Sequence, residues 1–121
     1  MSARILVVDD IELNRRLLEA KLAAEYYQVL VAPDGLSALE SARADSPDIV
    51  LLDVMMPGID GYETCRLLKE DEKTRHIPVL IVTALDERES RIKALESGAD
   101  DYLTKPIDDT QLMARIRNLA R

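Results

Sequence analysis

Short strand-like runs recur along the chain, separated by stretches with helical spacing of apolar residues. The strand-like runs are Ile5–Val8, Val29–Ala32, Ile49–Leu52, Val79–Val82 and Asp101–Thr104. The third run contains four consecutive apolar residues with no polar alternation. Such a run is typical of a strand that is buried on both faces of a parallel sheet. The pattern therefore predicts a five-stranded sheet with a largely buried centre.

Helical patterns occupy the segments between these runs. Leu13, Leu17, Ala20 and Ala24 mark one face of the first helix. The later helices are expected to open at Asp34, after Pro57-Gly58, at Asp86 and at Asp108, and the fourth to stop at Ser97-Gly98. Alternating strands and helices with short connections predict an α/β domain, with a parallel sheet and helices on both faces. We expect residues 1–121 to form one domain.

Composition narrows the class of protein. The net charge of −7 argues against a nucleic-acid surface, which requires a basic face. No apolar run approaches the length of a membrane span, and the N-terminus lacks a signal-peptide pattern. The only cysteine, Cys65, cannot form an internal disulfide, which fits a reducing compartment. We therefore expect a cytoplasmic protein that binds neither nucleic acid nor membrane directly.

Carboxylates follow two of the predicted strands. The first strand stops at Asp9-Asp10, and the third runs into Asp53. Because the carboxyl ends of parallel strands meet at one edge of a sheet, these three side chains are expected to converge. Like charges so close are unfavourable unless a cation lies between them. Alternatively, Asp9 or Asp10 merely caps the next helix, but this interpretation leaves Asp53 unexplained.

Two further strands end in groups suited to binding phosphoryl oxygens. The fourth strand offers the hydroxyl of Thr83, and the fifth offers the ammonium of Lys105, just before Pro106. Three carboxylates and one ammonium leave a net charge of −2, which a divalent hard cation would neutralise. Magnesium (Mg2+) is the usual occupant of a small carboxylate site. These groups together form the equipment for phosphoryl transfer.

This set of residues resembles the receiver domain of two-component response regulators, over essentially the whole chain. The matching positions are Asp9-Asp10, Asp53, Met56-Pro57-Gly58, Asp60-Gly61, Thr83 and Lys105-Pro106. Residues 53–58 and 104–109 are most similar to the first receiver of PleD-type regulators, whose output is a diguanylate cyclase. The resemblance implies a CheY-like, doubly wound (βα)5 flavodoxin-like fold. Its strand order would be 2-1-3-4-5, with the site between the first and third strands.

The resemblance also implies a reaction at Asp53. This residue would take a phosphoryl group from the phosphohistidine of a sensor histidine kinase or a histidine phosphotransfer protein. The side chains of Asp10 and Asp53 and the carbonyl oxygen of Met55 would coordinate Mg2+, and Asp9 would help directly or through water. The domain would be a signalling receiver. Its only catalysis would be its own phosphotransfer and a slow autodephosphorylation.

A switch is implied by the same resemblance. Thr83 and Lys105 would bind the phosphoryl oxygens, with the Lys105-Pro106 bond in the cis form. Tyr102 would reorient together with Thr83. The resulting change on the fourth helix, fifth strand and fifth helix would control an output domain or partner protein, and could promote a homodimer.

Two other function classes fit the residues less well. Aspartyl-phosphate hydrolases of the haloacid-dehalogenase type need a second acid two residues after the nucleophile, where this chain has Met55. A mononucleotide-binding module needs glycine in the first turn after a strand, but this turn reads Asp9-Asp10-Ile11-Glu12. Two carboxylates there would repel a phosphate. The receiver interpretation is therefore favoured.

Overall fold

The computed structural model describes residues 2–120. Strands and helices alternate along this range as β1 (Arg4–Val8), α1 (Glu12–Ala24), β2 (Gln28–Ala32), α2 (Gly35–Asp45), β3 (Ile49–Asp53), α3 (Gly61–Glu70), β4 (Val79–Thr83), α4 (Glu87–Ser97), β5 (Asp101–Thr104) and α5 (Asp109–Leu119). The strands form a five-stranded sheet in the order β2-β1-β3-β4-β5, with every neighbouring pair parallel. The predicted fold class and strand order are confirmed.

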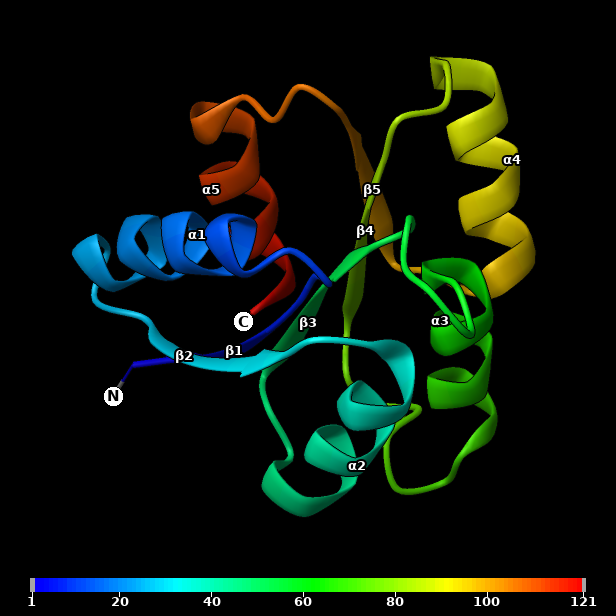
Figure 1. The fold of residues 1–121 in the computed structure, drawn as a ribbon, viewed down its shortest axis with the longest axis horizontal. Coiled ribbons are helices and arrows are strands. Elements are labelled where there is room, and N and C mark those ends of the chain that lie inside the picture. The colour runs from blue at the N-terminus through cyan, green and yellow to red at the C-terminus, as the bar shows by residue number, and fades with distance from the viewer. Residues whose placement is uncertain (1, 121) are drawn as a thin grey trace.

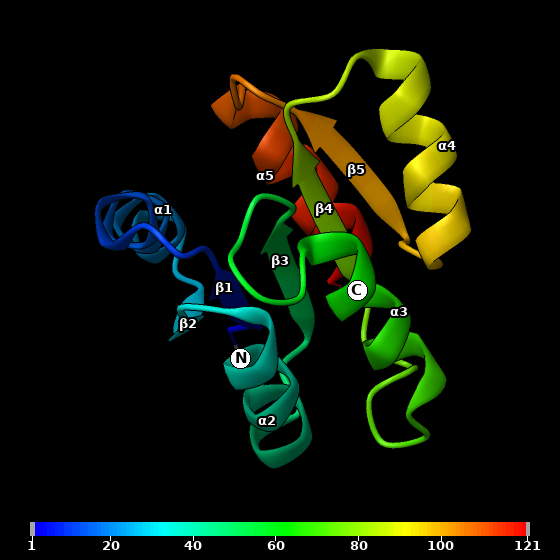
Figure 2. The same ribbon diagram turned by 45° about the vertical axis from the view of Figure 1, so that its right-hand side comes forward.

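Helices cover both faces of the sheet. Figure 1 shows α1 and α5 on one side and α2, α3 and α4 on the other, and Figure 2 shows the same layers from a second direction. Alternate residues of β3 enter the two cores: Ile49 and Leu51 pack with α1 and α5, and Val50 and Leu52 pack with α2 and α3. Every residue of β3 is buried. The prediction that this unbroken apolar run is a strand buried on both faces of the sheet is confirmed.

The helix ends are fixed by side-chain caps. Asp34, Asp60, Asp86 and Asp108 each accept a hydrogen bond from a backbone N–H in the first turn of the helix that follows. Gly98 ends α4 in the left-handed conformation, with φ of 81°. Caps of this kind stabilise a helix by about 1 kcal/mol each. None of the helices between residues 2 and 120 is long and apolar enough to cross a membrane.

The first helix turns a different face to the sheet from the one marked in the sequence. The marked residues are exposed: Leu13, Leu17, Ala20 and Ala24. Leu18 and the fully buried Leu22 pack against the sheet instead. Both stripes of leucines have helical spacing, so the periodicity alone did not distinguish them. The prediction was wrong because the packing partner decides which stripe is buried.

Candidate functional site

The structure brings the three predicted carboxylates together at the carboxyl edge of the sheet. Val8 of β1 lies opposite Leu52 of β3, so the residues that follow them are neighbours. Carboxylate oxygens of Asp9, Asp10 and Asp53 all lie within 4.8 Å of one another. Asp9 and Asp53 are each only 5% exposed, whereas Asp10 is open to solvent. Two of the three negative charges are therefore largely removed from water.

A glycine lets helix α3 begin directly against the end of β3. The backbone N–H of Gly61 donates to the carbonyl oxygen of Val54 at 2.9 Å. A Cβ at position 61 would lie 2.4 Å from the carbonyl oxygen of Asp53 and 2.7 Å from Cα of Val54. Since real Cβ atoms do not approach backbone so closely, a side chain here would displace α3 or the Asp53 backbone. Gly61 thus helps to set the position of Asp53.

Asp9 is held by the start of α1. Its carboxylate accepts the N–H of Ile11 at 2.9 Å, and Arg15 donates to its carbonyl oxygen at 2.7 Å. Burial raises the pKa of Asp9 above its ordinary value, the nearby charge of Asp53 adds to this, and the Ile11 N–H opposes it. The capping alternative is thus partly right for Asp9, although the helix cap is Ile11 and has no side-chain bond. It still leaves Asp53 unexplained.

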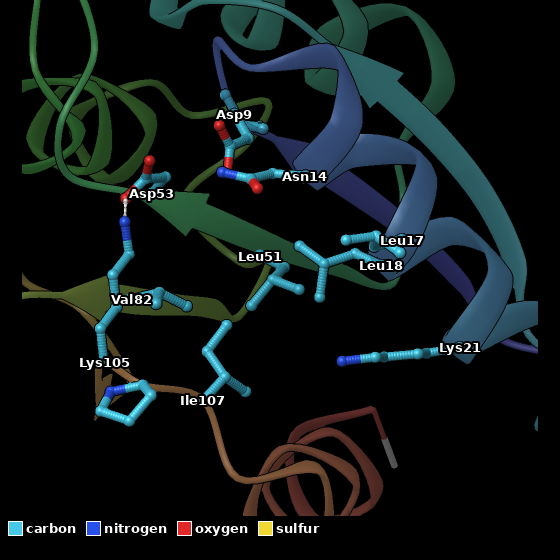
Figure 3. A pocket seen from close by; sticks show the side chains of 12 residues that line it. Asp9, Asn14, Leu17, Leu18, Lys21, Leu51, Asp53, Val82, Lys105 and Ile107 are labelled. Carbon is cyan, nitrogen blue, oxygen red and sulfur yellow. Dashed lines mark ion pairs between the residues drawn. The ribbon is translucent and has the colours of Figure 1, made fainter.

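Lys105 reaches the third carboxylate from β5. Its Nζ lies 2.9 Å from Oδ1 of Asp53, as Figure 3 shows, and the Lys105-Pro106 bond is cis. This contact is an ion pair without hydrogen-bond geometry. Oδ1 is buried and accepts no hydrogen bond from any residue in the described part of the chain. The Lys105 ammonium balances part of the charge of this buried oxygen, and its unused acceptor positions are suited to a cation.

Asp53 and Lys105 border a cavity on each side. Toward α1 and α5 the cavity is about 290 Å³ and includes Asp9 and Asn14 (Figure 3). On the other side a cavity of about 470 Å³ includes Asp10 and Met55. Met55 is 68% exposed, and because a thioether is a poor ligand for a hard cation, the group that Met55 can offer such an ion is its backbone carbonyl. There is room beside Asp53 for a hydrated ion and for an incoming group.

Asn14 is a site residue that the sequence analysis missed. It lies on the first turn of α1 beside Asp9, and its side-chain hydrogen bond acts to lower the pKa of that carboxyl. The available signal was its spacing, one helical turn after Asp10. It went unused because a lone asparagine on a helix is usually solvated.

The predicted switch residues do not face each other. Thr83, at the end of β4, is 1% exposed. Its Oγ1 accepts the N–H of Leu85 at 3.1 Å and lies 3.2 Å from the hydroxyl of Tyr62 on α3, which donates to it. The hydroxyl of Tyr102 instead donates to Glu87 of α4 at 2.5 Å, and this hydrogen bond raises the pKa of Tyr102. The sequence signals did not assign a role to Tyr62.

Comparison with known proteins places this site in a family. Residues 5–117 match the response regulator receiver domain family. The response regulator PleD of Caulobacter vibrioides is 68% identical over 121 residues, which are 100% of this chain and 27% of PleD. A putative response regulator from Chloroflexus aurantiacus has a TM-score of 0.93 at 34% identity, with 99% of this chain and 98% of that chain covered.

A second similar solved structure contains a bound metal ion. It is the receiver domain of the sensor histidine kinase PA1611 from Pseudomonas aeruginosa, with a magnesium ion coordinated in the active site cleft. Its TM-score is 0.89 at 31% identity, with 99% of this chain and 98% of that chain covered.

The chain belongs to the family of response regulator receiver domains, the signalling modules of two-component systems. It spans about a quarter of the length of PleD, 27%, so what the rest of that regulator does is not carried by the matched residues.

Proposed function

We propose that residues 1–121 form one receiver domain that accepts a phosphoryl group on Asp53 from the phosphohistidine of a sensor histidine kinase or histidine phosphotransfer protein. The observation that carries this proposal is the buried Oδ1 of Asp53, which lies 2.9 Å from Lys105 Nζ and accepts no hydrogen bond from residues 2–120. A carboxylate oxygen of Asp53 attacks phosphorus as the phosphorus–nitrogen bond breaks. The imidazole leaves with the bonding electrons and takes up a proton.

The donor set fits Mg2+. Asp9, Asp10 and Asp53 offer hard carboxylate oxygens within 4.8 Å of one another, and Met55 borders the same cavity as Asp10 and Asp53. We assign Asp10, Asp53 and the Met55 carbonyl as direct ligands, with Asp9 binding directly or through water. When bound, the ion neutralises negative charge on the carboxylates and on the phosphoryl oxygens. The magnesium ion in the PA1611 receiver supports this assignment.

Lys105 and Thr83 complete the proposed phosphoryl site. The ammonium of Lys105 is already beside Asp53 and can pair with a phosphoryl oxygen without moving far. The Thr83 hydroxyl would donate to a second oxygen. This movement of Thr83, and of Tyr102 after it, is the proposed signal to α4, β5 and α5. Apart from its own phosphotransfer and a slow autodephosphorylation, the domain would catalyse no reaction.

The output is proposed from similarity. The 68% identity to PleD supports a diguanylate cyclase or another partner protein as the target of the switch, and a homodimer promoted by phosphorylation as its form. A cytoplasmic location is part of the same proposal. It is supported by Cys65, a free thiol buried in the core, with a pKa that burial raises to about 11.

Phosphorylation by phosphoramidate in the presence of Mg2+ tests the function. Intact-mass measurement should show one added phosphoryl group, and peptide mapping should place it on Asp53. Asp53→Asn should remove it completely. The matched control is Asp60→Asn, because Asp60 borders the same cavity as Asp53 but serves as the cap of α3, a role that asparagine can fill. Phosphate on any residue other than Asp53 contradicts the proposal.

A further inference from the structure

Strand alternation directs the side chains of Asp53 and Thr83 to opposite faces of the sheet, although Asp53, at the end of β3, borders a cavity on each side. The cavity toward α1 and α5 is lined by Asp53 together with Leu51 and Val82. Thr83 follows Val82 on β4, and successive side chains of a strand point to opposite faces. Its side chain is accordingly bonded to Tyr62 on the α3 side. A Thr83 hydroxyl that is to donate to a group on Asp53 therefore has to turn from the α3 side, where it now accepts from Tyr62.

Two donors hold the Thr83 hydroxyl in its present position. The N–H of Leu85, 3.1 Å away, and the hydroxyl of Tyr62, 3.2 Å away, take both acceptor positions of Oγ1. Thr83 is 1% exposed, so water has little access to replace either bond. Breaking the bond to Tyr62 without a substitute would leave a poorly solvated hydroxyl, which is unfavourable. Neither of these bonds uses the O–H donor of Thr83, and a phosphoryl oxygen is a strong acceptor for that donor, so the bond donated to it can offset the loss.

Tyr62 itself connects three elements. It belongs to α3, packs against the core between the sheet and α2–α3, and reaches β4 through its hydroxyl. Lys93 of α4 lies over its ring, with Nζ 5.9 Å from the ring centroid. Tyr102, by contrast, has its hydroxyl on Glu87 at the surface. Tyr62 thus donates a hydrogen bond to Thr83 and also lies against Lys93 of α4.

We propose that Tyr62 is a positioning residue that holds the Thr83 hydroxyl on the α3 side of the sheet while Asp53 is unphosphorylated. The inference rests on the proposed function of Asp53. A phosphoryl group engages Thr83 only in molecules in which the Tyr62–Thr83 bond is broken, so its apparent affinity falls with the fraction of such molecules. Release of Tyr62 then changes the contact of its ring with Lys93 on α4.

Titration with beryllofluoride and Mg2+ tests this role, with the dissociation constant measured by calorimetry and by amide shifts. Tyr62→Phe keeps the ring and removes only the hydroxyl. It should tighten binding by about two- to tenfold, the factor that one hydrogen bond is worth. In a Thr83→Ala background the same change should have no effect, because the partner of the hydroxyl is gone. Tyr26→Phe, at a tyrosine that is 84% exposed, is the matched control and should bind as the wild type does.

The outcomes separate the two proposals. Unchanged or weaker binding by Tyr62→Phe overturns the role of Tyr62, as does an equal gain in the Thr83→Ala background. A gain in Tyr102→Phe that Tyr62→Phe lacks would assign the position of Thr83 to the other aromatic residue. A wild type that binds no beryllofluoride and takes no phosphoryl group on Asp53 overturns the proposed function itself. Melting temperatures measured for all variants exclude misfolding as the cause.

Discussion

Two regions at the carboxyl edge of the sheet differ in how well their polar groups are paired. The acid half consists of Asp9, Asp10 and Asp53, and the switch half consists of Thr83 and Tyr102. On the acid half, Oδ1 of Asp53 is buried without a hydrogen bond from the described residues, and the pKa of Asp9 is raised mainly by burial. On the switch half, Thr83 and Tyr102 both have hydrogen-bond partners. Under the proposed function, a cation and a phosphoryl group would offset the buried charge of the acids and would break the bond between Thr83 and Tyr62. The free energy gained at the acids would then drive the rearrangement at Thr83.

The start of α3 joins the two halves. Gly61 donates to the carbonyl oxygen of Val54, the residue after Asp53, and the next residue, Tyr62, donates to Thr83. The two contacts are adjacent in the sequence, so a shift of this helix end moves both. The difference between the halves is thus a property of one local backbone arrangement, and it can be tested by perturbing each half separately.

The largest loss of stability and of Mg2+ binding is expected from a substitution at the start of α3, which perturbs both halves. Gly61→Ala places a Cβ 2.4 Å from the carbonyl oxygen of Asp53, so backbone must move. We expect a loss of about 1–3 kcal/mol in the free energy of unfolding, as for other overpacked sites, and weaker binding of Mg2+. Urea denaturation and metal titration measure these two quantities.

Gly58→Ala is the control for this change. Gly58 has φ of 77°, but a Cβ there would meet nothing within 4 Å. The cost there should come from backbone conformation alone, about 1 kcal/mol, and Mg2+ affinity should be less affected than in Gly61→Ala. If Gly58→Ala proves the more damaging variant in both measurements, the close approach of α3 to Asp53 is not what positions the site.

The second prediction concerns the acid half alone. In EDTA, Asp10→Asn removes one of three carboxylates whose oxygens lie within 4.8 Å. Because Asp10 is exposed and screened by water, the relief of repulsion should raise the free energy of unfolding by only about 1 kcal/mol. Binding of Mg2+ should weaken at the same time.

An exposed loop acid supplies the comparison for Asp10→Asn. Glu72→Gln removes the same charge away from the cluster and should change neither quantity. Should Asp10→Asn lower the stability of the metal-free protein, Asp10 would be held by structural hydrogen bonds rather than strained by its neighbours.

Much of this edge was predictable because it depends on local sequence. A strand that runs without a polar residue into Asp53 and an Asp at the start of α2, α3, α4 and α5 are short-range signals. Parallel neighbours then bring strand ends together without further information. The fold and the meeting of Asp9, Asp10 and Asp53 followed from these signals.

The contacts of Tyr62, Tyr102 and Leu22 could not be predicted, because they depend on how helices and strands pack against one another. Tyr62 fits the apolar spacing of α3, and nothing local says that its hydroxyl meets Thr83, 21 residues later. The outward direction of Tyr102 likewise depends on where α4 puts Glu87. In α1, two leucine stripes satisfy the same periodicity, and only the sheet determines that Leu22 is buried. Sequence therefore identified the acid half better than the switch half.

The third prediction uses the raised pKa of Asp9. A carboxyl whose folded pKa exceeds its unfolded one binds more protons when folded. Its contribution to stability is therefore greatest at acid pH and is lost as the pH rises from its ordinary 3.8 through the raised value. Without metal, the wild type should lose stability relative to Asp9→Asn over this interval.

The free energy of unfolding is measured against pH for the wild type and for Asp9→Asn, and one curve is subtracted from the other. The subtraction removes the pH dependence that other acids contribute in the opposite direction, such as Asp34, whose pKa is lowered by its cap bond with Ser37. Asparagine keeps an acceptor for the Ile11 N–H, so the difference reports the charge of Asp9. Saturating Mg2+ favours the carboxylate and should reverse the sign. A difference that does not vary with pH would mean that burial of Asp9 is offset by its hydrogen bonds.

The smallest effect is expected from Tyr102→Phe, on the switch half. Its bond to Glu87 lies at the surface, where water replaces a lost partner. We therefore expect a change in beryllofluoride affinity of less than about twofold, well below that of Tyr62→Phe. Glu87→Gln provides an independent check, because the bond to Glu87 is the main cause of the raised pKa of Tyr102, which should then return toward 10 in an ultraviolet titration. A large gain in affinity from either variant would show that the surface bond to Glu87, and not the buried bond to Thr83, keeps the unphosphorylated domain in its present state.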